Sequence, residues 1–209
     1  LLDDLANDAK HIGKRTVETI FIGGGTPSLF SAEAIYDILS GVKSRVNLSN
    51  SAEITMEANP GTVEAGKFSG FYQAGVNRIS VGIQSFQEKH LGVLGRIHNA
   101  HQAENAVKQA HTAGLPTFNL DLMHGLPEQS VDNAMSDLRK GIALAPYHLS
   151  WYQLTIEPNT PFYSRPPELP DDDILWDIQE KGHALLEAEG FQQYEISGYA
   201  KPGHQCRHN

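Results

Sequence analysis

Three successive glycines, Gly23 to Gly25, precede Thr26 and Pro27 at the end of the apolar run 16–24. Glycine has no Cβ, so the backbone N–H and C=O groups of such a segment can approach a ligand closely. The segment lacks the Lys-Ser/Thr pair of a Walker phosphate loop and the spacing of a GxGxxG fingerprint. Two interpretations stay open: a backbone edge that binds a ligand, and a tight turn between a strand and a helix.

Four polar side chains occur where later apolar runs end. Glu57 and Gln84 are near the ends of runs 51–59 and 77–86, Arg96 follows in LGRIH, and Asp121 interrupts run 115–127. A buried carboxylate is costly without a partner, and a guanidinium suits a carboxylate or phosphate. Singly, each residue also has an ordinary explanation as a salt bridge, a strand-end amide or a surface arginine. Together, four polar groups at strand ends predict one binding site.

Apolar runs and amphipathic helical segments alternate along the chain, which is typical of β-α-β units with a parallel sheet. Strands are predicted at 16–24, 51–59, 77–86, 115–127, 148–158 and 191–200, the last antiparallel or at an edge. Helices are predicted at 1–15, 32–46, 62–75, 89–94, 100–113, 130–145 and 171–189, with Ser31 and Ser130 as N-caps. The proline-rich segment 159–170 is expected to be a loop without regular structure.

Nearly every predicted strand ends in a polar or glycine cluster. An open doubly wound sheet concentrates such clusters at its single switch point, whereas a TIM-like barrel uses the carboxyl ends of all its strands. The pattern therefore favours an α/β fold of the TIM-like type, complete or partial.

The composition narrows the function classes. The chain has 209 residues, 16 Lys+Arg and 25 Asp+Glu, so its formal charge of -9 disfavours nucleic acid and anionic membranes as partners. No apolar run approaches the ~20 residues needed to cross a bilayer. Peripheral membrane contact is left open, and a cytoplasmic location is the simplest expectation. Cys206 is the single cysteine, which excludes an intrachain disulfide and a metal site made of cysteines alone.

Seven motifs in this order resemble the radical S-adenosylmethionine proteins of the oxygen-independent coproporphyrinogen III oxidase group. They are GGGTPS, EANP, NRISVGIQSF, LGRIH, NLDLMHGLP, WYQLTIEPNT and YEISGYAKPGHQCRHN. Within that group the sequence is most similar to the coproporphyrinogen-oxidase-like branch described as haem chaperones. The resemblance implies a partial (βα)6 barrel, a four-iron, four-sulfur (4Fe-4S) cluster and S-adenosylmethionine bound to it.

The resemblance also implies roles at the methionine end of S-adenosylmethionine. Gly24, Gly25 and Thr26 would meet the side of the ligand that carries the amine. Arg96 would bind the carboxylate.

Four further residues would complete the S-adenosylmethionine site by the same resemblance. Glu57, Gln84 and Asp121 would serve the amine and ribose region, and the backbone of Thr155 would contact the adenosyl group.

The family holds its cluster with three cysteines in a loop after the first barrel strand. These cysteines would precede Leu1, so the ligands of the 4Fe-4S cluster are absent from this chain and the sequence is expected to be partial. Residues 1–158 are expected to form the partial barrel core. Residues 159–209 would supply its last helix and strand and lead into a missing C-terminal domain.

The sequence alone leaves three functions open. A haem chaperone is favoured because the His208-Asn209 pair occupies the place of that branch's haem-associated motif, which makes His208 the candidate haem ligand. Its partners would be haem and haem-accepting proteins. A coproporphyrinogen III oxidase, an oxidoreductase acting on a porphyrinogen, is the alternative, so the sequence leaves open whether the protein is an enzyme. A TIM-barrel enzyme with a phosphate site is disfavoured, because no Lys or Arg stands near the glycines.

Overall fold

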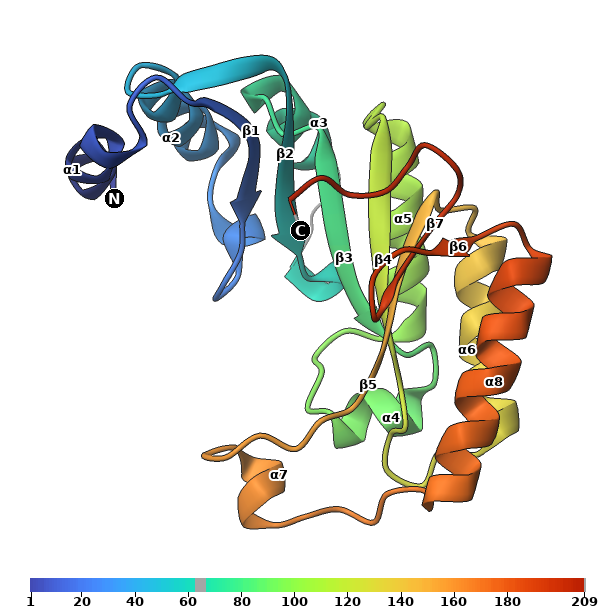
Figure 1. Cartoon of the computed structure of the whole chain (residues 1–209). Coiled ribbons are helices and arrows are strands. Elements are labelled where there is room, and N and C mark those ends of the chain that lie inside the picture. The colour runs from blue at the N-terminus through green and yellow to red at the C-terminus, as the bar shows by residue number, and fades with distance from the viewer. Residues whose placement is uncertain (63–66, 209) are drawn as a thin grey trace.

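The computed structural model describes residues 1–62 and 67–208, and five parallel strands make up most of its sheet, from one edge inward. The parallel strands are β1 (Thr16–Ile22), β2 (Asn47–Ala58), β3 (Arg78–Gln84), β4 (Thr117–His124) and β5 (His148–Gln153). They follow one another in sequence order across the sheet. Each crossover places a helix on the same side, so the sheet curves into part of a TIM-like barrel (Figure 1). The predicted fold class is thereby confirmed.

Two short strands close the described sheet beyond β5. The strand β7 (Gly198–Ala200) pairs antiparallel with β5, and β6 (Gln192–Gln193) pairs antiparallel with β7. The last predicted strand, 191–200, is therefore two short strands joined by a tight turn, which are antiparallel and lie at the edge of the sheet. After β7 the chain crosses the open side of the sheet and ends beside β2 (Figure 1).

Most of the helices cover the other side of the sheet. The long ones there are α2 (Ala32–Lys43), α3 (Lys67–Ala74), α5 (Ala100–Thr112), α6 (Val131–Ala143) and α8 (Asp172–Ala188). The helix α1 (Leu2–Ile12) packs against α2 at the outer end of the sheet (Figure 1). Ser31 caps α2, because its Oγ accepts from the N–H of Ala34 at 3.1 Å. Ser130 caps α6 in a reciprocal capping box with Asn133. Both predicted N-caps are confirmed.

Shorter helical turns lie at the carboxyl ends of the strands. They are η1 (Pro27–Leu29), η2 (Pro60–Thr62), α4 (Glu88–Val93) and α7 (Pro161–Ser164). The turn α7 corrects the expectation that 159–170 is without regular structure. Pro161 is its first residue, where a missing N–H costs no intrahelical bond, and the Thr160 Oγ1 accepts from the N–H of Tyr163 at 3.2 Å. The predicted helix 62–75 is described from Lys67 onward, and 63–66 lie outside the described residues.

Strict alternation along the central strands divides the core from the open face of the sheet. In β3, Ile79, Val81 and Ile83 are fully buried in the hydrophobic core against the helices. Arg78 and Ser80, which alternate with these residues along the strand, line a cavity on the opposite face. The strands β4 and β5 repeat this pattern, so one face of the sheet is apolar and the other carries polar groups.

Candidate functional site

The open face of the sheet holds a cavity of about 550 Å³. Its floor is formed by polar residues of β2, β3, β4 and β5, and the C-terminal segment that follows β7 covers one side. Seven of the predicted site residues line it: Gly25, Thr26, Glu57, Gln84, Arg96, Asp121 and His208. Their meeting in one cavity follows from parallel strands that end at the same edge.

The glycine segment meets Glu57 across the ends of β1 and β2. The Gly24 N–H donates to Glu57 Oε2 at 3.1 Å, and Gly24 and Gly25 have φ angles of +82° and +58°. A Cβ on Gly23 would lie 2.5 Å from the Phe21 ring and 3.1 Å from Glu57 Oε2. Glycine is thus required where the strand passes the carboxylate, and the half-buried Glu57 keeps acceptor capacity that faces the cavity.

Gln84 reaches the cavity through an irregular end of β3. The pairing register with β4 shifts between Gly82 and Gln84, and Gln84 has a φ of +69°, which is unusual for a residue with a side chain. The Tyr152 O–H of β5 donates to Gln84 Oε1 at 2.7 Å. Burial, followed by the negative charge of Asp121, raises the pKa of Tyr152 to about 12, so the phenol stays a donor. The Gln84 amide is therefore left with its N–H groups for a ligand.

Asp121 accepts hydrogen bonds from Ser80 and Asn119 on the sheet floor, and the side chain of Ser150 also favours its charged form. Ser80 Oγ donates to its Oδ2 at 2.8 Å, and Asn119 Nδ2 donates to its Oδ1 at 2.7 Å. Burial raises the pKa of Asp121, although these hydrogen bonds oppose the shift. Each carboxylate oxygen can accept a further donor, such as a hydroxyl of a bound ligand.

Arg96 lies after α4 at the carboxyl ends of the strands and lines the cavity. Its side chain is exposed, and within the described part of the chain none of the ion pairs includes it. An exposed guanidinium without an ion pair at the mouth of a cavity is available to bind an anionic group.

Thr155 is placed differently from the expectation. The strand β5 ends at Gln153, so Thr155 lies in the following loop with an exposed side chain and is not part of the cavity lining. The strand β5 ends at Gln153 because its neighbour β4 turns away at Gly125. The last backbone hydrogen bond between the two segments runs from Leu154 N–H to His124 O at 2.9 Å. The backbone contact of Thr155 with a ligand stays a prediction.

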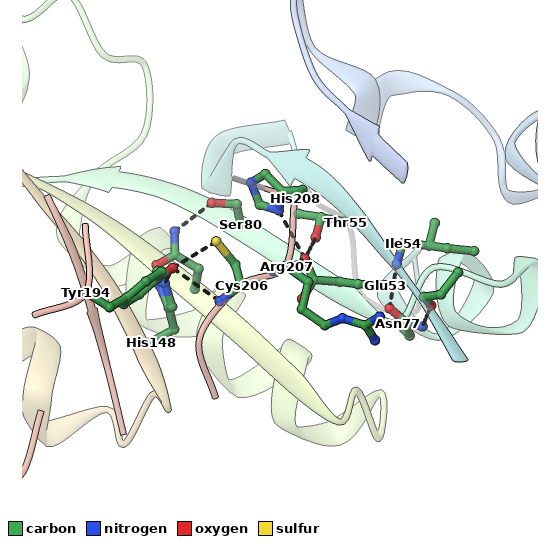
Figure 2. Close-up of polar contacts among 12 residues, drawn as sticks. Glu53, Ile54, Thr55, Asn77, Ser80, His148, Tyr194, Cys206, Arg207 and His208 are labelled. Carbon is green, nitrogen blue, oxygen red and sulfur yellow. Dashed lines mark hydrogen bonds and ion pairs between the residues drawn. The ribbon is translucent and has the colours of Figure 1, made fainter. Parts of the chain in front are cut away.

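Sequence reasoning missed a hydrogen-bonded chain across the floor of the cavity. His148 Nδ1 is 2.6 Å from Asn119 Oδ1, His148 Nε2 is 2.6 Å from Tyr194 Oη, and Tyr194 Oη is 2.8 Å from Cys206 Sγ (Figure 2). Because the Asn119 amide N–H groups point at Ser80 and Asp121, its oxygen must accept from His148 Nδ1–H. His148 Nε2 then accepts from Tyr194.

The pKa of His148 agrees with these donor directions, which require a neutral ring. Burial, followed by the positive charge of Arg78, lowers the pKa of His148 to about 3, so the ring is neutral near pH 7. Tyr194 in turn accepts from the backbone N–H of Cys206 at 3.2 Å. The chain ties the C-terminal segment to β4 and β5. Alternating polar residues in 78–84, 119–121 and 148–152 were the sequence signal that could have revealed this floor.

His208 is held at the edge of the cavity by two contacts. Its Nδ1 is 3.1 Å from Glu53 Oε1 (Figure 2), and the centroid of its ring is 4.6 Å from that of the Phe21 ring. Within residues 1–62 and 67–208, no hydrogen bond involves His208 Nε2. Arg207 fixes the same segment, because its N–H donates to Glu53 and its guanidinium pairs with Glu18 at 3.1 Å. Asn209 lies outside the described residues.

The described residues do not fit a 4Fe-4S cluster. Such a cluster takes several cysteine thiolates, and Cys206 is the single cysteine of the chain. No group of three or more His, Cys, Asp and Glu is placed to hold a metal ion in the part of the chain that the structure describes. Within those same residues no helix is long and apolar enough to span a membrane.

Comparison with known proteins agrees with this geometry. The Radical SAM superfamily model matches residues 1–138. The chain is 63% identical to "Heme chaperone HemW" of Escherichia coli and 58% identical to that of Haemophilus influenzae, over its whole length and 55% and 56% of theirs. It therefore spans about half the length of these curated relatives.

Solved structures show the same fold. The radical SAM coproporphyrinogen III oxidase of Escherichia coli matches 97% of the chain and 48% of its own length, with a TM-score of 0.85 and 25% identity. The archaeal Elp3 of Methanocaldococcus infernus matches 87% of the chain and 49% of its own, with a TM-score of 0.68 and 15% identity. Family model, relatives and barrel together show that this chain belongs to the radical S-adenosylmethionine superfamily, whose members imply S-adenosylmethionine and a 4Fe-4S cluster as cofactors.

Proposed function

We propose that the full-length protein is a haem chaperone, which binds S-adenosylmethionine and haem in the cavity on the open face of the sheet. The observation that carries the proposal is His208, whose Nδ1 is bonded to Glu53 while its Nε2 faces no partner among the described residues. Histidines that bind metals commonly donate their other N–H to a carboxylate, which fixes the ring and raises its basicity. Haem iron accepts such an imidazole as an axial ligand. The relatives named haem chaperones support the same reading.

The amine and carboxylate of S-adenosylmethionine would be bound between β1, β2 and the segment after α4. Thr26 and the backbone of Gly24 and Gly25 would meet the amine side, with Glu57 as the counter-charge of the amine. Arg96 would bind the carboxylate with its planar fork. The close approach of Gly23 to Glu57 supports this assignment, because any side chain there would occupy the space beside the carboxylate.

The ribose and adenosine would lie over β3 and β4. Gln84, held by Tyr152, and Asp121, held by Ser80, present oriented groups for the ribose hydroxyls. Thr155 keeps its proposed backbone contact with the adenosyl group, which would require the loop after β5 to move inward. Bound S-adenosylmethionine supplies a sulfonium beside these groups. The single cysteine of this chain cannot supply the ligands of the cluster.

A coproporphyrinogen III oxidase is the second candidate, favoured by the fold likeness to the Escherichia coli enzyme. Both candidates handle a tetrapyrrole, so cofactor binding does not separate them. Haem-accepting partner proteins, a cytoplasmic location and the division into residues 1–158 and 159–209 belong to the proposal as well.

Haem titration of the full-length protein tests the proposal. We expect stoichiometric binding, followed by the Soret band, and a clear loss of affinity in His208→Ala with S-adenosylmethionine affinity unchanged. His101→Ala is the matched control, because His101 is exposed on α5. If His208→Ala binds haem as the wild type does, His208 is not the ligand. If the protein instead decarboxylates coproporphyrinogen III and binds no haem, the second candidate is correct.

A further inference from the structure

Arg78 is a buried cation without a bonded anion. The residue is 2% exposed, and its Nε has no hydrogen-bond partner in the described part of the chain. None of the ion pairs among those residues includes it. Burying a charge costs free energy unless it is paired, so a guanidinium in this state indicates a missing anionic partner.

The side chains around Arg78 are already bonded to one another. Arg78 lines the cavity together with Ser80, Asn119, His148 and Tyr194. Both nitrogens of His148 are used by Asn119 and Tyr194, and the Asn119 oxygen accepts from His148. The neutral ring of His148 adds no negative charge.

The neighbouring carboxylate does not neutralise Arg78. Asp121 directs its two oxygens to Ser80 and Asn119 rather than to the guanidinium. The attraction of Arg78 is the smallest of the influences on the pKa of Asp121, which burial raises. The positive charge of Arg78 is thus directed at the cavity.

We propose that Arg78 is a carboxylate-binding subsite at the amino-terminal ends of the strands, and that it takes a propionate side chain of haem. This assignment rests on the proposed function. Arg96, at the carboxyl ends of the strands, is already the candidate for the carboxylate of S-adenosylmethionine, so a second cation in the same cavity fits a second carboxylate. Haem carries two propionates beside an iron that His208 can bind. Arg78 and His208 line the same cavity.

The carboxylate could come from S-adenosylmethionine instead of haem, and the experiment separates these sources. Full-length wild type and Arg78→Met are titrated with haem, with haem dimethyl ester, whose propionates are uncharged, and with S-adenosylmethionine. Methionine fills the buried space without a charge, so we expect the variant to fold, because the change removes the cost of burying an unpaired charge. Arg139→Met is the matched control, because Arg139 is exposed on α6.

We expect Arg78→Met to weaken haem binding by at least about tenfold, the loss of one charged hydrogen bond, and to leave the dimethyl ester and S-adenosylmethionine unchanged. Weaker binding of S-adenosylmethionine with unchanged haem would keep the carboxylate subsite and assign it to that ligand. Unchanged affinity for both ligands would overturn the proposal.

Two results keep the proposed function and this inference apart. If the wild type binds no haem, the haem-chaperone proposal fails, and the S-adenosylmethionine titration alone decides on Arg78. If Arg78→Met does not fold, the wild type decides, because the subsite requires it to prefer haem over the dimethyl ester by about tenfold. Equal affinity for the acid and the ester would then refute the propionate subsite.

Discussion

Glu53 is predicted to tune the iron affinity of His208, and Glu53→Gln isolates its charge. Glu53 Oε1 accepts from the Arg207 N–H at 3.0 Å, from His208 Nδ1 at 3.1 Å and from Thr55 Oγ1 at 3.4 Å. Its side chain is 10% exposed, so solvent screens these contacts little. Glutamine keeps an oxygen in the same place and can retain all three contacts, while the negative charge is lost.

The expected magnitude follows from the kind of hydrogen bond. A bond to a charged group contributes about 1.5–3 kcal/mol and a neutral one about 0.5–1.5 kcal/mol. Replacing the first by the second at His208 costs about 1–1.5 kcal/mol, which is about tenfold in haem affinity. A less basic imidazole also stabilises ferric iron less, so the reduction potential of bound haem should rise. A purely structural role of Glu53 would leave that potential unchanged.

The assay is a Soret titration combined with potentiometry on full-length protein. Glu18→Gln is the matched control, because Glu18 contacts the same C-terminal segment through Arg207 but not through His208. We expect the control to behave as the wild type does. If Glu53→Gln and wild type share one haem affinity and one potential, the carboxylate does not act on the iron ligand and the reasoning is refuted.

Three further predictions concern the ligand clamp and the stability of the fold. Arg96→Lys keeps the charge but loses the fork, so S-adenosylmethionine should bind ~1–3 kcal/mol more weakly by calorimetry, and equal affinity would argue against a carboxylate clamp. Gly182→Ala should lower the free energy of unfolding in urea by about 1–3 kcal/mol, because the new Cβ would lie 1.8 Å from the Trp151 ring. Gly92→Ala is the control: a Cβ there would have nothing within 4 Å, so the change should be neutral or stabilising. Equal effects of the two changes would exclude the overlap with Trp151. Burial lowers the pKa of His124 to about 4, so the unfolded chain takes up its proton first, and this group should contribute about 2 kcal/mol to the loss of stability between pH 7 and pH 5, beside the contribution of His148. His124→Gln should reduce the loss by about that amount, and an unchanged loss would contradict the cause.

The convergence of Glu57, Gln84 and Asp121 could be predicted from sequence because it needs only the alternation of strands and helices. Parallel strands bring their carboxyl ends to one edge of the sheet, so residues near those ends lie close together. The position of Thr155 could not be predicted in the same way. Where β5 ends depends on β4, which leaves the sheet at Gly125.

Contacts between residues far apart in the sequence could not be predicted from it. Glu53 and His208 are 155 residues apart, and nothing in either neighbourhood marks the other as a partner. Arg78 stands at the beginning of its strand, away from the strand ends on which the site was predicted. Its alternation with Ser80 and Gly82 places it on the polar face, but whether a guanidinium there is paired depends on the packing of β4, β5 and the C-terminal segment.

A crystal structure of full-length protein with haem bound tests the central claim most directly, namely that the cavity over the sheet is a haem site whose iron ligand comes from the C-terminal segment. We predict iron bonded to His208 Nε2, with His208 Nδ1 still donating to Glu53 and a propionate against Arg78. Iron bonded to another residue, or haem bound outside this cavity, would contradict it.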